Sequence, residues 1–241
     1  SLGAATGPAT SASDCGDKAL LTGSTFAAGD IINIVTNGGM MDTISLDGAD
    51  ISGTAGNPVI IRGNSSYMTA STNTYVLRLN GSSNDVDYVT IENFWAQNTL
   101  SGSDVTDGLI NFIGNVGTAS NSSINVTGCQ ARSLRGDGFS QVSGAGNAGR
   151  INYTNCNTIN CGSSSTGSHQ GWTAHQPGQS AVLTNCTSTD DREAISFVGG
   201  STGTWVSGTI TDSLATCVKA DSGSTVNIES GVTVNCGGGG D

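Results

Sequence analysis

The stretch that decides the fold is INVTGCQARS, which begins at Ile124 and recurs as INYTNCNTIN from Ile151 and as AVLTNCTSTD from Ala181. Aligning the three copies stacks one cysteine from each, namely Cys129, Cys156 and Cys186, and it also stacks Asn155 on Asn185. A phrase that recurs at this interval indicates a solenoid, in which each repeat forms one coil and packs on its neighbours.

A second repeated phrase fills the intervals between the copies of the first. It reads DGLINFIGN from Asp107, DGFSQVSG from Asp137, QGWTAHQPG from Gln170, EAISFVGG from Glu193 and TCVKADSG from Thr216. Each copy begins with small or polar residues, alternates apolar with polar residues, and ends in glycine. This pattern is typical of a short strand that leaves into a turn. We therefore expect the chain to alternate between two ladders of strands.

One inward-facing position is predicted for each copy in both ladders. In the first ladder these positions are Leu109, Phe139, Trp172, Ile195 and Val218. In the second ladder they are Ile91, Val126, Tyr153, Leu183, Val206 and Ile228. The step is 23 residues from Ile195 to Val218 and 22 from Val206 to Ile228. Both ladders thus settle to one short step, which identifies the minimal coil, with longer loops inserted upstream.

The residues that fill the repeats decide what kind of solenoid forms. The chain has 36 glycines and only 11% charged residues, and its repeats are full of valine, isoleucine, threonine and asparagine. A helical solenoid needs long runs of strong helix formers, which these repeats lack. Strands that repeat in the same direction at every coil pair in parallel, roughly 4.8 Å apart. The predicted fold class is therefore all-β, a parallel β-helix.

Two stretches near the start of the chain carry a family resemblance. FAAGDIINIV from Phe26, followed by ISGTAGNPVIIRG from Ile51, resembles the opening coil of the right-handed parallel β-helix proteins of the pectate-lyase superfamily. In that opening, a "pGD" turn leads into the first strand and "GtagnPi.irG" leads into a later one. The resemblance extends to about Val234. It implies a single-stranded right-handed β-helix (β-solenoid), and it leaves the activity open because the superfamily includes polysaccharide lyases, hydrolases, epimerases, phage tailspikes, adhesins and structural proteins.

The chain is predicted to form one elongated domain, because a solenoid adds coils without changing its cross-section. We expect a short N-terminal cap over residues 1–29, the β-helix over 30–235, and a glycine-rich exit linker over 236–241. The run GGGGD cannot cover an open sheet edge, and an uncovered edge invites pairing with another chain. Either the natural chain continues past Asp241, or a protein partner or neighbouring copy covers this C-terminal end.

The charge and composition of the chain limit the classes of partner that it can bind and indicate where it is located. The formal net charge is −11, with eight lysines and arginines together, which argues against binding to nucleic acid or to an anionic membrane. No segment is apolar for long enough to insert into a membrane. Richness in serine, threonine, asparagine and glycine is typical of β-solenoids that are extracellular or on a cell or virion surface, which is the predicted location.

The seven cysteines leave one unpaired if all the others form disulfides. Three of them occupy the stacked inward position, where we expect small buried thiols, although neighbouring coils lie within the Cα separation that a disulfide allows. Cys156 and Cys161 could form a local bridge across a turn. No cysteine lies beside a histidine at the spacing of metal ligands, so no zinc site is expected.

The candidate site is the set of polar residues that precede or face outward from the strands of the second phrase. Stacking the three residues before each strand brings together Arg135 to Asp137, Ser168 to Gln170, and Asp191 to Glu193. Outward positions on the strands add Ser140, Thr173, His175, Ser196, Lys219 and Asp221. Both histidines of the chain fall in one coil, directly after the loop CGSSSTGS, which is long enough to form one wall of a groove. By the resemblance, such a groove suits an extended polysaccharide.

If the site is catalytic, two mechanisms are open. A lyase needs a cation to acidify the proton beside a uronate carboxylate and a base to remove it; Asp137, Asp191 and Glu193 are then the Ca²⁺ candidates, with Lys219 or Arg192 as the base. A hydrolase needs two carboxylates about 5 to 9.5 Å apart, for which Asp137 and Glu193 are the candidates. Gln170 lies between them, where polygalacturonase-like enzymes would be richer in aspartate.

The predicted catalytic residues are thus Asp137, Glu193, Arg192 and Lys219. The predicted ligand-binding residues are Arg135, His169, His175, Asp191 and Asp221. Trp172 is expected in the core rather than in a sugar platform. No cofactor is required, apart from Ca²⁺ in the lyase interpretation.

The competing interpretation is a non-catalytic surface protein, such as a virion spike, a decoration module or an adhesin, that uses the β-helix as a rigid rod. It explains the sparse ionisable residues, the neutral hydroxyl and amide surface and the uncovered C-terminal end. We favour this structural or adhesive role, with a polysaccharide or cell-surface glycan bound along the side and another chain at the end. The polysaccharide lyase or glycoside hydrolase is the alternative.

Overall fold

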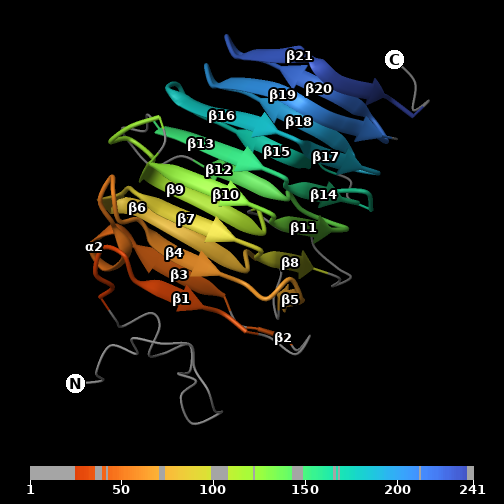
Figure 1. The fold of residues 1–241 in the computed structure, drawn as a ribbon. Coiled ribbons are helices and arrows are strands. Elements are labelled where there is room, and N and C mark those ends of the chain that lie inside the picture. The colour runs from red at the N-terminus through yellow and green to blue at the C-terminus, as the bar shows by residue number, and fades with distance from the viewer. Residues whose placement is uncertain are drawn as a thin grey trace.

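The strands stack coil upon coil into an elongated parallel β-helix, which runs from β1 near the N-terminus to β21 near the C-terminus (Figure 1). The computed structural model describes residues 25–35, 40–41, 43–70, 74–98, 108–121, 123–142, 149–164, 167, 169–211 and 213–237. Paired strands are parallel from the first coil, where β1 pairs with β4, to the last, where β19 pairs with β21. The predicted all-β fold class and the parallel β-helix are confirmed.

In the described part of the chain, the strands form three faces. Face 1 consists of β1 (Ile31–Asn33), β4 (Val59–Arg62), β7 (Val89–Glu92), β10 (Ile124–Thr127), β13 (Gly149–Thr154) and β16 (Gln179–Thr184). Face 2 consists of β2 (Met40–Met41), β5 (Tyr67–Ala70), β8 (Trp95–Asn98), β11 (Gln130–Ser133), β14 (Asn157–Ile159) and β17 (Cys186–Thr189). Face 3 consists of β3 (Ile44–Asp47), β6 (Leu77–Val86), β9 (Ile110–Val116), β12 (Phe139–Val142), β15 (Gln170–Ala174), β18 (Glu193–Phe197) and β20 (Thr216–Ala220).

Two long strands join faces 1 and 2 at the C-terminal end. β19 (Thr202–Thr211) pairs with β16 along its first half and with β17 along its second half, and β21 (Thr225–Asn235) pairs with β19 on both halves. A short helix, α2 (Gly48–Ile51), follows β3 and is capped by the side chain of Asp47. No helix in the described residues is long and apolar enough to cross a membrane.

The prediction of two strand ladders was wrong, because the phrase INVTGCQARS contains two strands rather than one. β10 and β11 lie on either side of Gly128, which has a positive φ of 63°. The equivalent corners are Asn155 and Asn185, with φ of 54° and 52°. Asparagine and glycine tolerate this left-handed conformation, so one residue turns the chain from face 1 to face 2. The predicted asparagine stack is confirmed, because Asn185 Nδ2 donates to Asn155 Oδ1 at 2.6 Å.

The predicted register is right at most positions and slips by one residue at two of them. On face 3, Phe139 pairs with Trp172, Trp172 with Ile195, and Ile195 with Val218, as predicted. The partner of Phe139 in the previous coil, however, is Ile110 rather than Leu109. On face 1, Val126, Tyr153 and Leu183 stack as predicted, and Leu183 then pairs with Trp205 rather than with Val206.

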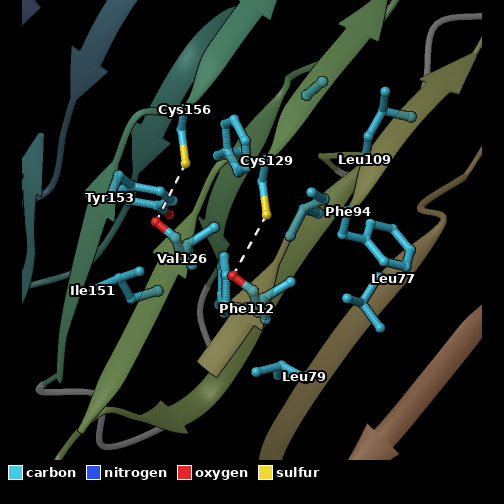
Figure 2. Packing of buried hydrophobic residues seen from close by; sticks show 14 of the residues in the cluster. Leu77, Leu79, Phe94, Leu109, Phe112, Val126, Cys129, Ile151, Tyr153 and Cys156 are labelled. Carbon is cyan, nitrogen blue, oxygen red and sulfur yellow. Dashed lines mark hydrogen bonds between the residues drawn. The ribbon is translucent and has the colours of Figure 1, made fainter. Parts of the chain in front are cut away.

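The core is a column of buried side chains enclosed by the three faces, part of which Figure 2 shows. Trp172 is 1% exposed, which confirms its predicted place in the core. Its ring stacks on that of Phe139 with centroids 5.6 Å apart, and it meets Trp205 edge to face at 5.1 Å. Such pairs stabilise a core beyond the area that they bury.

The stacked cysteines are buried free thiols, as predicted. Cys129, Cys156 and Cys186 lie directly after the corner between faces 1 and 2. The Cys156 thiol donates to the carbonyl of Val126 at 3.3 Å, and the Cys129 thiol donates to that of Ile91 at 3.6 Å (Figure 2). Burial raises the pKa of Cys156 well above its ordinary value. The bridge considered between Cys156 and Cys161 does not form, since both are free.

The last coil carries a disulfide that the sequence did not indicate. Cys217 on β20 is bonded to Cys236, with the Cα atoms 5.9 Å apart. Cys236 is the first residue of the predicted exit linker, so the bond fastens that segment to face 3. The predicted N-terminal cap falls mostly on residues 1–24, which lie outside the described residues.

Removing this disulfide is expected to loosen the last coil alone. In the Cys236→Ser variant, amide hydrogen exchange in β21 should accelerate, because a cross-link that closes a loop of this size contributes up to about 3 kcal/mol. The strands of the central coils should exchange at their wild-type rates, since coils of a solenoid contact only their neighbours. Equal acceleration throughout the described strands, or none in β21, would contradict this assignment.

Candidate functional site

One column of polar side chains marks the corner at which each coil enters face 3. Gln170 on β15 pairs with Glu193 on β18, which pairs in turn with Thr216 on β20. Because Phe139 pairs with Trp172, Asp137 occupies the same place one coil before Gln170. Gln170, Glu193 and Thr216 are the first residues of their strands, so the polar column stands at the rim where each coil enters face 3. The stacking of Asp137, Gln170 and Glu193 predicted from the sequence is therefore present.

Asp137 and His169 form an acid–imidazole pair at this rim. His169 Nδ1 lies 3.3 Å from Asp137 Oδ1, and the backbone N–H of Gln170 donates to the same oxygen at 2.8 Å. In the neutral ring, a proton on Nδ1 facing the carboxylate makes Nε2 the acceptor. Gly162, with φ of +69°, lets the chain pass close by, since a Cβ there would lie 2.5 Å from that of His169.

Gln170 connects Asp137 to the next carboxylate. While its backbone N–H binds Asp137, its side-chain Nε2 donates to Glu193 Oε2 at 2.8 Å. The other carboxylate oxygen of Glu193, Oε1, lies 3.8 Å from Lys219 Nζ. The Lys219 side chain is 38% exposed and that of Glu193 only 9%. The arrangement is a chain of charge-assisted contacts that runs along the solenoid axis from His169 to Lys219.

A pocket of about 300 Å³ lies on the outer side of face 3 beside these residues. Its lining consists of Asp137, His169, Gln170, Thr173, His175, Ser196, Val198 and Lys219. The hydroxyl of Thr173 lies 3.0 Å from Nε2 of His175, so both histidines of the chain line one pocket with defined partners. Ser140, predicted at an outward position, is 1% exposed and does not line the pocket, and a Cβ on Gly108 would lie 2.5 Å from that of Ser140.

Asp191, predicted to bind ligand or metal, lies inside the coil instead. Its carboxylate is completely buried and accepts hydrogen bonds from the hydroxyls of Thr158 and Ser188 and from the backbone N–H of Cys161. The left-handed Asp190, with φ of 54°, turns the chain so that the next side chain points inward. Burial raises the pKa of Asp191 to about 6, against the lowering effect of these three donors.

The remaining predicted site residues lie around the pocket rather than in it. Arg135 and Arg192 are half-buried on the turns that lead into β12 and β18, and neither lines the pocket. Asp221 is exposed on the turn after β20, where it accepts from the backbone N–H of Ser222. The structure therefore brings Asp137, Lys219 and the two histidines together in the pocket lining, and Glu193 contacts the pocket residues Gln170 and Lys219 without lining the pocket itself. Arg135, Arg192, Asp191 and Asp221 lie outside the pocket.

The predicted calcium ligands do not converge. With Asp191 inside the coil, Asp137 and Glu193 remain on the rim with Gln170 between them. Across the described ranges, no three histidine, cysteine, aspartate or glutamate side chains gather to hold a metal ion.

The sequence analysis missed two features of the pocket. It did not include Val198 in the lining, and it did not pair His169 with Asp137, because the stacking of the repeats placed Gly136 beside His169.

Comparison with protein-family models, with curated proteins and with solved structures finds no match for this chain. The class that the fold and site define is therefore a parallel β-helix with a charged, hydroxyl-rich pocket on one face.

Proposed function

We propose that this chain is an extracellular or virion-surface β-helix of the pectate-lyase-like kind that binds a polysaccharide or cell-surface glycan across face 3. The observation that carries the proposal is the pocket on face 3, which gathers both histidines and Lys219 in a chain with only eight lysines and arginines. The resemblance of the opening coil at Phe26 and Ile51 supports the family part of the proposal.

The chemistry of the pocket suits a glycan. Hydroxyls of Thr173 and Ser196, the amide of Gln170, two imidazoles and an ammonium group line it. These groups donate and accept hydrogen bonds as sugar hydroxyls require, and Lys219 offers a cation to an acidic sugar. The column from Asp137 to Lys219 crosses successive coils, so an extended ligand can lie along the solenoid axis.

The proposed location rests on the disulfide and on the surface composition. Disulfides persist in oxidising compartments, and Cys217–Cys236 closes the last coil. Outward positions on the later coils carry mostly neutral hydroxyl and amide groups, such as Asn157, Thr187 and Thr209. Such a surface is typical of proteins that remain in contact with solvent outside the cell.

A protein partner or a neighbouring copy at β21 is the second part of the proposal. Ile228 and Val234, which pair with Trp205 and Ile210 of the coil beneath, are 36% and 44% exposed. The outer edge of β21 presents apolar side chains and backbone groups on which a further strand could pair. Light scattering across a wide concentration range tests for a neighbouring copy: a concentration-dependent rise in mass supports it, and a constant monomer mass opposes it.

Changing Lys219 should weaken glycan binding. In affinity electrophoresis through gels that contain a panel of acidic and neutral polysaccharides, Lys219→Ala should raise the dissociation constant for an acidic glycan about tenfold or more, since hydrogen bonds to charged groups contribute about 1.5 to 3 kcal/mol. Arg132→Ala is the matched control, because Arg132 is exposed on face 2. If both substitutions weaken polysaccharide binding equally, or if no polysaccharide retards the wild type or the variants in the gel, the face 3 pocket is not the glycan site.

A catalytic function is the second candidate, and the paired carboxylates favour it. Asp137 and Glu193 are two coils apart, roughly 9 to 10 Å at the usual strand spacing, which is close to the separation in inverting glycoside hydrolases. His169 and Lys219 stand beside them as proton donors or acceptors. For a lyase, Lys219 is the base that lies at the pocket, whereas Arg192 does not line it.

Two assays on the same polysaccharide panel, each with and without calcium, decide between these functions. Ultraviolet absorbance from an unsaturated uronate product, lost in Lys219→Ala, would establish a lyase. New reducing ends without that absorbance, lost in Asp137→Asn and Glu193→Gln, would establish a hydrolase. Binding with silence in both assays supports the non-catalytic role that we favour.

A further inference from the structure

A second, smaller pocket lies where face 3 turns into face 1, apart from the face 3 pocket described above. It has a volume of about 160 Å³ and is lined by Gly117, Thr118, Asn121, Gly149, Arg150, Gly178 and Ser180. Three glycines from successive coils form part of its wall. They are held together by backbone hydrogen bonds, from Gly149 N–H to Gly178 O and from Arg150 N–H to Gly117 O, both at 3.2 Å.

Among the described residues that line this pocket, Arg150 is the only charged one. Its Nε–H donates to Asn152 Oδ1 at 3.0 Å, and Asn152 Nδ2 donates to the carbonyl of Asn121 at 2.8 Å. The guanidinium is therefore oriented through one of its three nitrogens, and its two terminal amino groups are not used in these contacts. An arginine held in this way is a preorganised fork of donors.

No carboxylate in the described residues forms an ion pair with Arg150, although the chain has 19 aspartates and glutamates. By contrast, Arg62 pairs with Glu92 at 2.8 Å. The acid nearest to the pocket in the hydrogen-bond network is Asp87, which accepts from the hydroxyl of Thr118 at 3.2 Å and from the N–H of Ala119 at 2.9 Å. Asp87 is thus engaged with the turn on one wall and forms no ion pair with Arg150.

The glycines of this pocket cannot be replaced without straining the backbone or moving a neighbouring coil. Gly117 has a φ of +81° and Gly178 a φ of +82°, conformations that side chains disfavour. A Cβ on Gly149 would lie 2.0 Å from the carbonyl oxygen of Val116. The backbones of successive coils therefore approach closely at the wall of the pocket, while Ser180 and Asn121 add a hydroxyl and an amide to the lining.

We propose that this second pocket binds an oxoanion, with Arg150 as its principal ligand. Guanidinium groups bind carboxylate, sulfate and phosphate through two parallel hydrogen bonds, which fits a fork whose Nε is already engaged. The anion can be a free inorganic ion or the carboxylate or sulfate ester of an acidic sugar, since the chemistry that recognises them is the same. This second pocket is separate from the face 3 pocket, and its test does not depend on the proposed glycan function.

Isothermal titration of the full chain with inorganic sulfate, glucuronate and a sulfated monosaccharide, at constant ionic strength, tests the proposal. We expect saturable binding at one site in the wild type, weakened at least tenfold in Arg150→Gln, which keeps a planar amide but loses the charge. Arg150→Lys, which keeps the charge without the fork, should bind with intermediate affinity. Arg132→Gln on face 2 removes the same charge elsewhere and should bind as the wild type does.

The pattern of affinities identifies the source of the anion. Tighter binding of the sugar-borne anions than of sulfate assigns the pocket to an acidic glycan, and equal or weaker binding assigns it to a free anion. Wild-type affinity in both Arg150 variants, or no saturable binding of any of the three anions to the wild type, would overturn the proposal. If Arg150→Gln does not fold, the Arg150→Lys variant still tests the proposal, because its affinity for the anions can be compared with that of the wild type.

Discussion

Replacing Trp172 with alanine is expected to lower the free energy of unfolding by about 3 to 5 kcal/mol, as for other buried aromatic residues. Trp172 is almost completely buried and lies between the rings of Phe139 and Trp205. Truncation would leave a cavity that three coils share and that β-strands fixed by parallel pairing cannot collapse to fill. Phe139→Ala should have an effect in the same range, because Phe139 also contacts Tyr153 at a centroid distance of 5.2 Å.

Denaturant unfolding followed by circular dichroism measures these losses. Trp172→Phe is the conservative variant and should cost clearly less than alanine, since most of the ring volume remains. Leu214→Ala is the surface control, because Leu214 is 47% exposed and its truncation should change stability by no more than about 0.5 kcal/mol. Near-neutral stability of both Trp172→Ala and Phe139→Ala would contradict the register of face 3 and the placement of the pocket residues with it.

The second large effect concerns pH and the buried Asp191. Its pKa is raised from 3.8 to about 6 in the folded protein, whereas in the unfolded chain it keeps its ordinary value. Well below pH 3.8 the group is protonated in both states and its contribution to stability is fully present. As pH rises to about 6, the unfolded state ionises more readily than the folded state. Folding therefore loses about 3 kcal/mol from this group over that window, since one pKa unit corresponds to about 1.4 kcal/mol.

Asp191→Asn should abolish this part of the pH dependence, because an amide occupies the site without ionising. Its oxygen can still accept from the N–H of Cys161, and hydroxyls such as that of Ser188 can accept from its amino group. Unfolding free energies of the wild type and the variant at several pH values between 4 and 7 measure the difference. Asp221→Asn, an exposed aspartate, is the matched control. Parallel pH profiles for the wild type and Asp191→Asn would show that Asp191 titrates normally.

The fold could be predicted because each coil repeats the same chemical pattern. The stacked cysteines and asparagines define the coil, and the step of the ladders fixes the parallel pairing. The third face escaped detection because a single left-handed residue, such as Asn155, forms the corner between β13 and β14. One residue of this kind leaves no run of glycine or proline to mark a turn, so two strands resemble one.

The register slips have a common physical cause. Leu109 and Ile110 are adjacent apolar residues, as are Trp205 and Val206, so period-two alternation does not decide which of them faces the core. The backbone pairing selects Ile110 and Trp205 as the partners of Phe139 and Leu183, although Leu109 is buried in the core as well. Before Asp191, the left-handed residue Asp190 interrupts the alternation of inward and outward side chains. The carboxylate of Asp191 therefore points inward and is buried, whereas an aspartate is normally expected on the surface.

The candidate site could be predicted in part, namely where the register of the strands was clear from the sequence. Asp137, Gln170 and Glu193 could be stacked because they precede strands whose register is clear. The contact between His169 and Asp137 runs diagonally between coils and depends on the turn at Gly162, which no repeat pattern describes. The Cys217–Cys236 disulfide was hidden as well, because the spacing of cysteines alone does not reveal their connectivity.

Hydrogen exchange in the presence of the polysaccharide that binds most tightly tests the central proposal most directly, since it locates the ligand on the β-helix. We expect slower exchange for the amides of β12, β15, β18 and β20 and for the turn at His169, with face 1 and face 2 strands unaffected. Protection confined to strands of face 1 or face 2, or no protection with any polysaccharide of the panel, would contradict the assignment of the face 3 pocket as the glycan site.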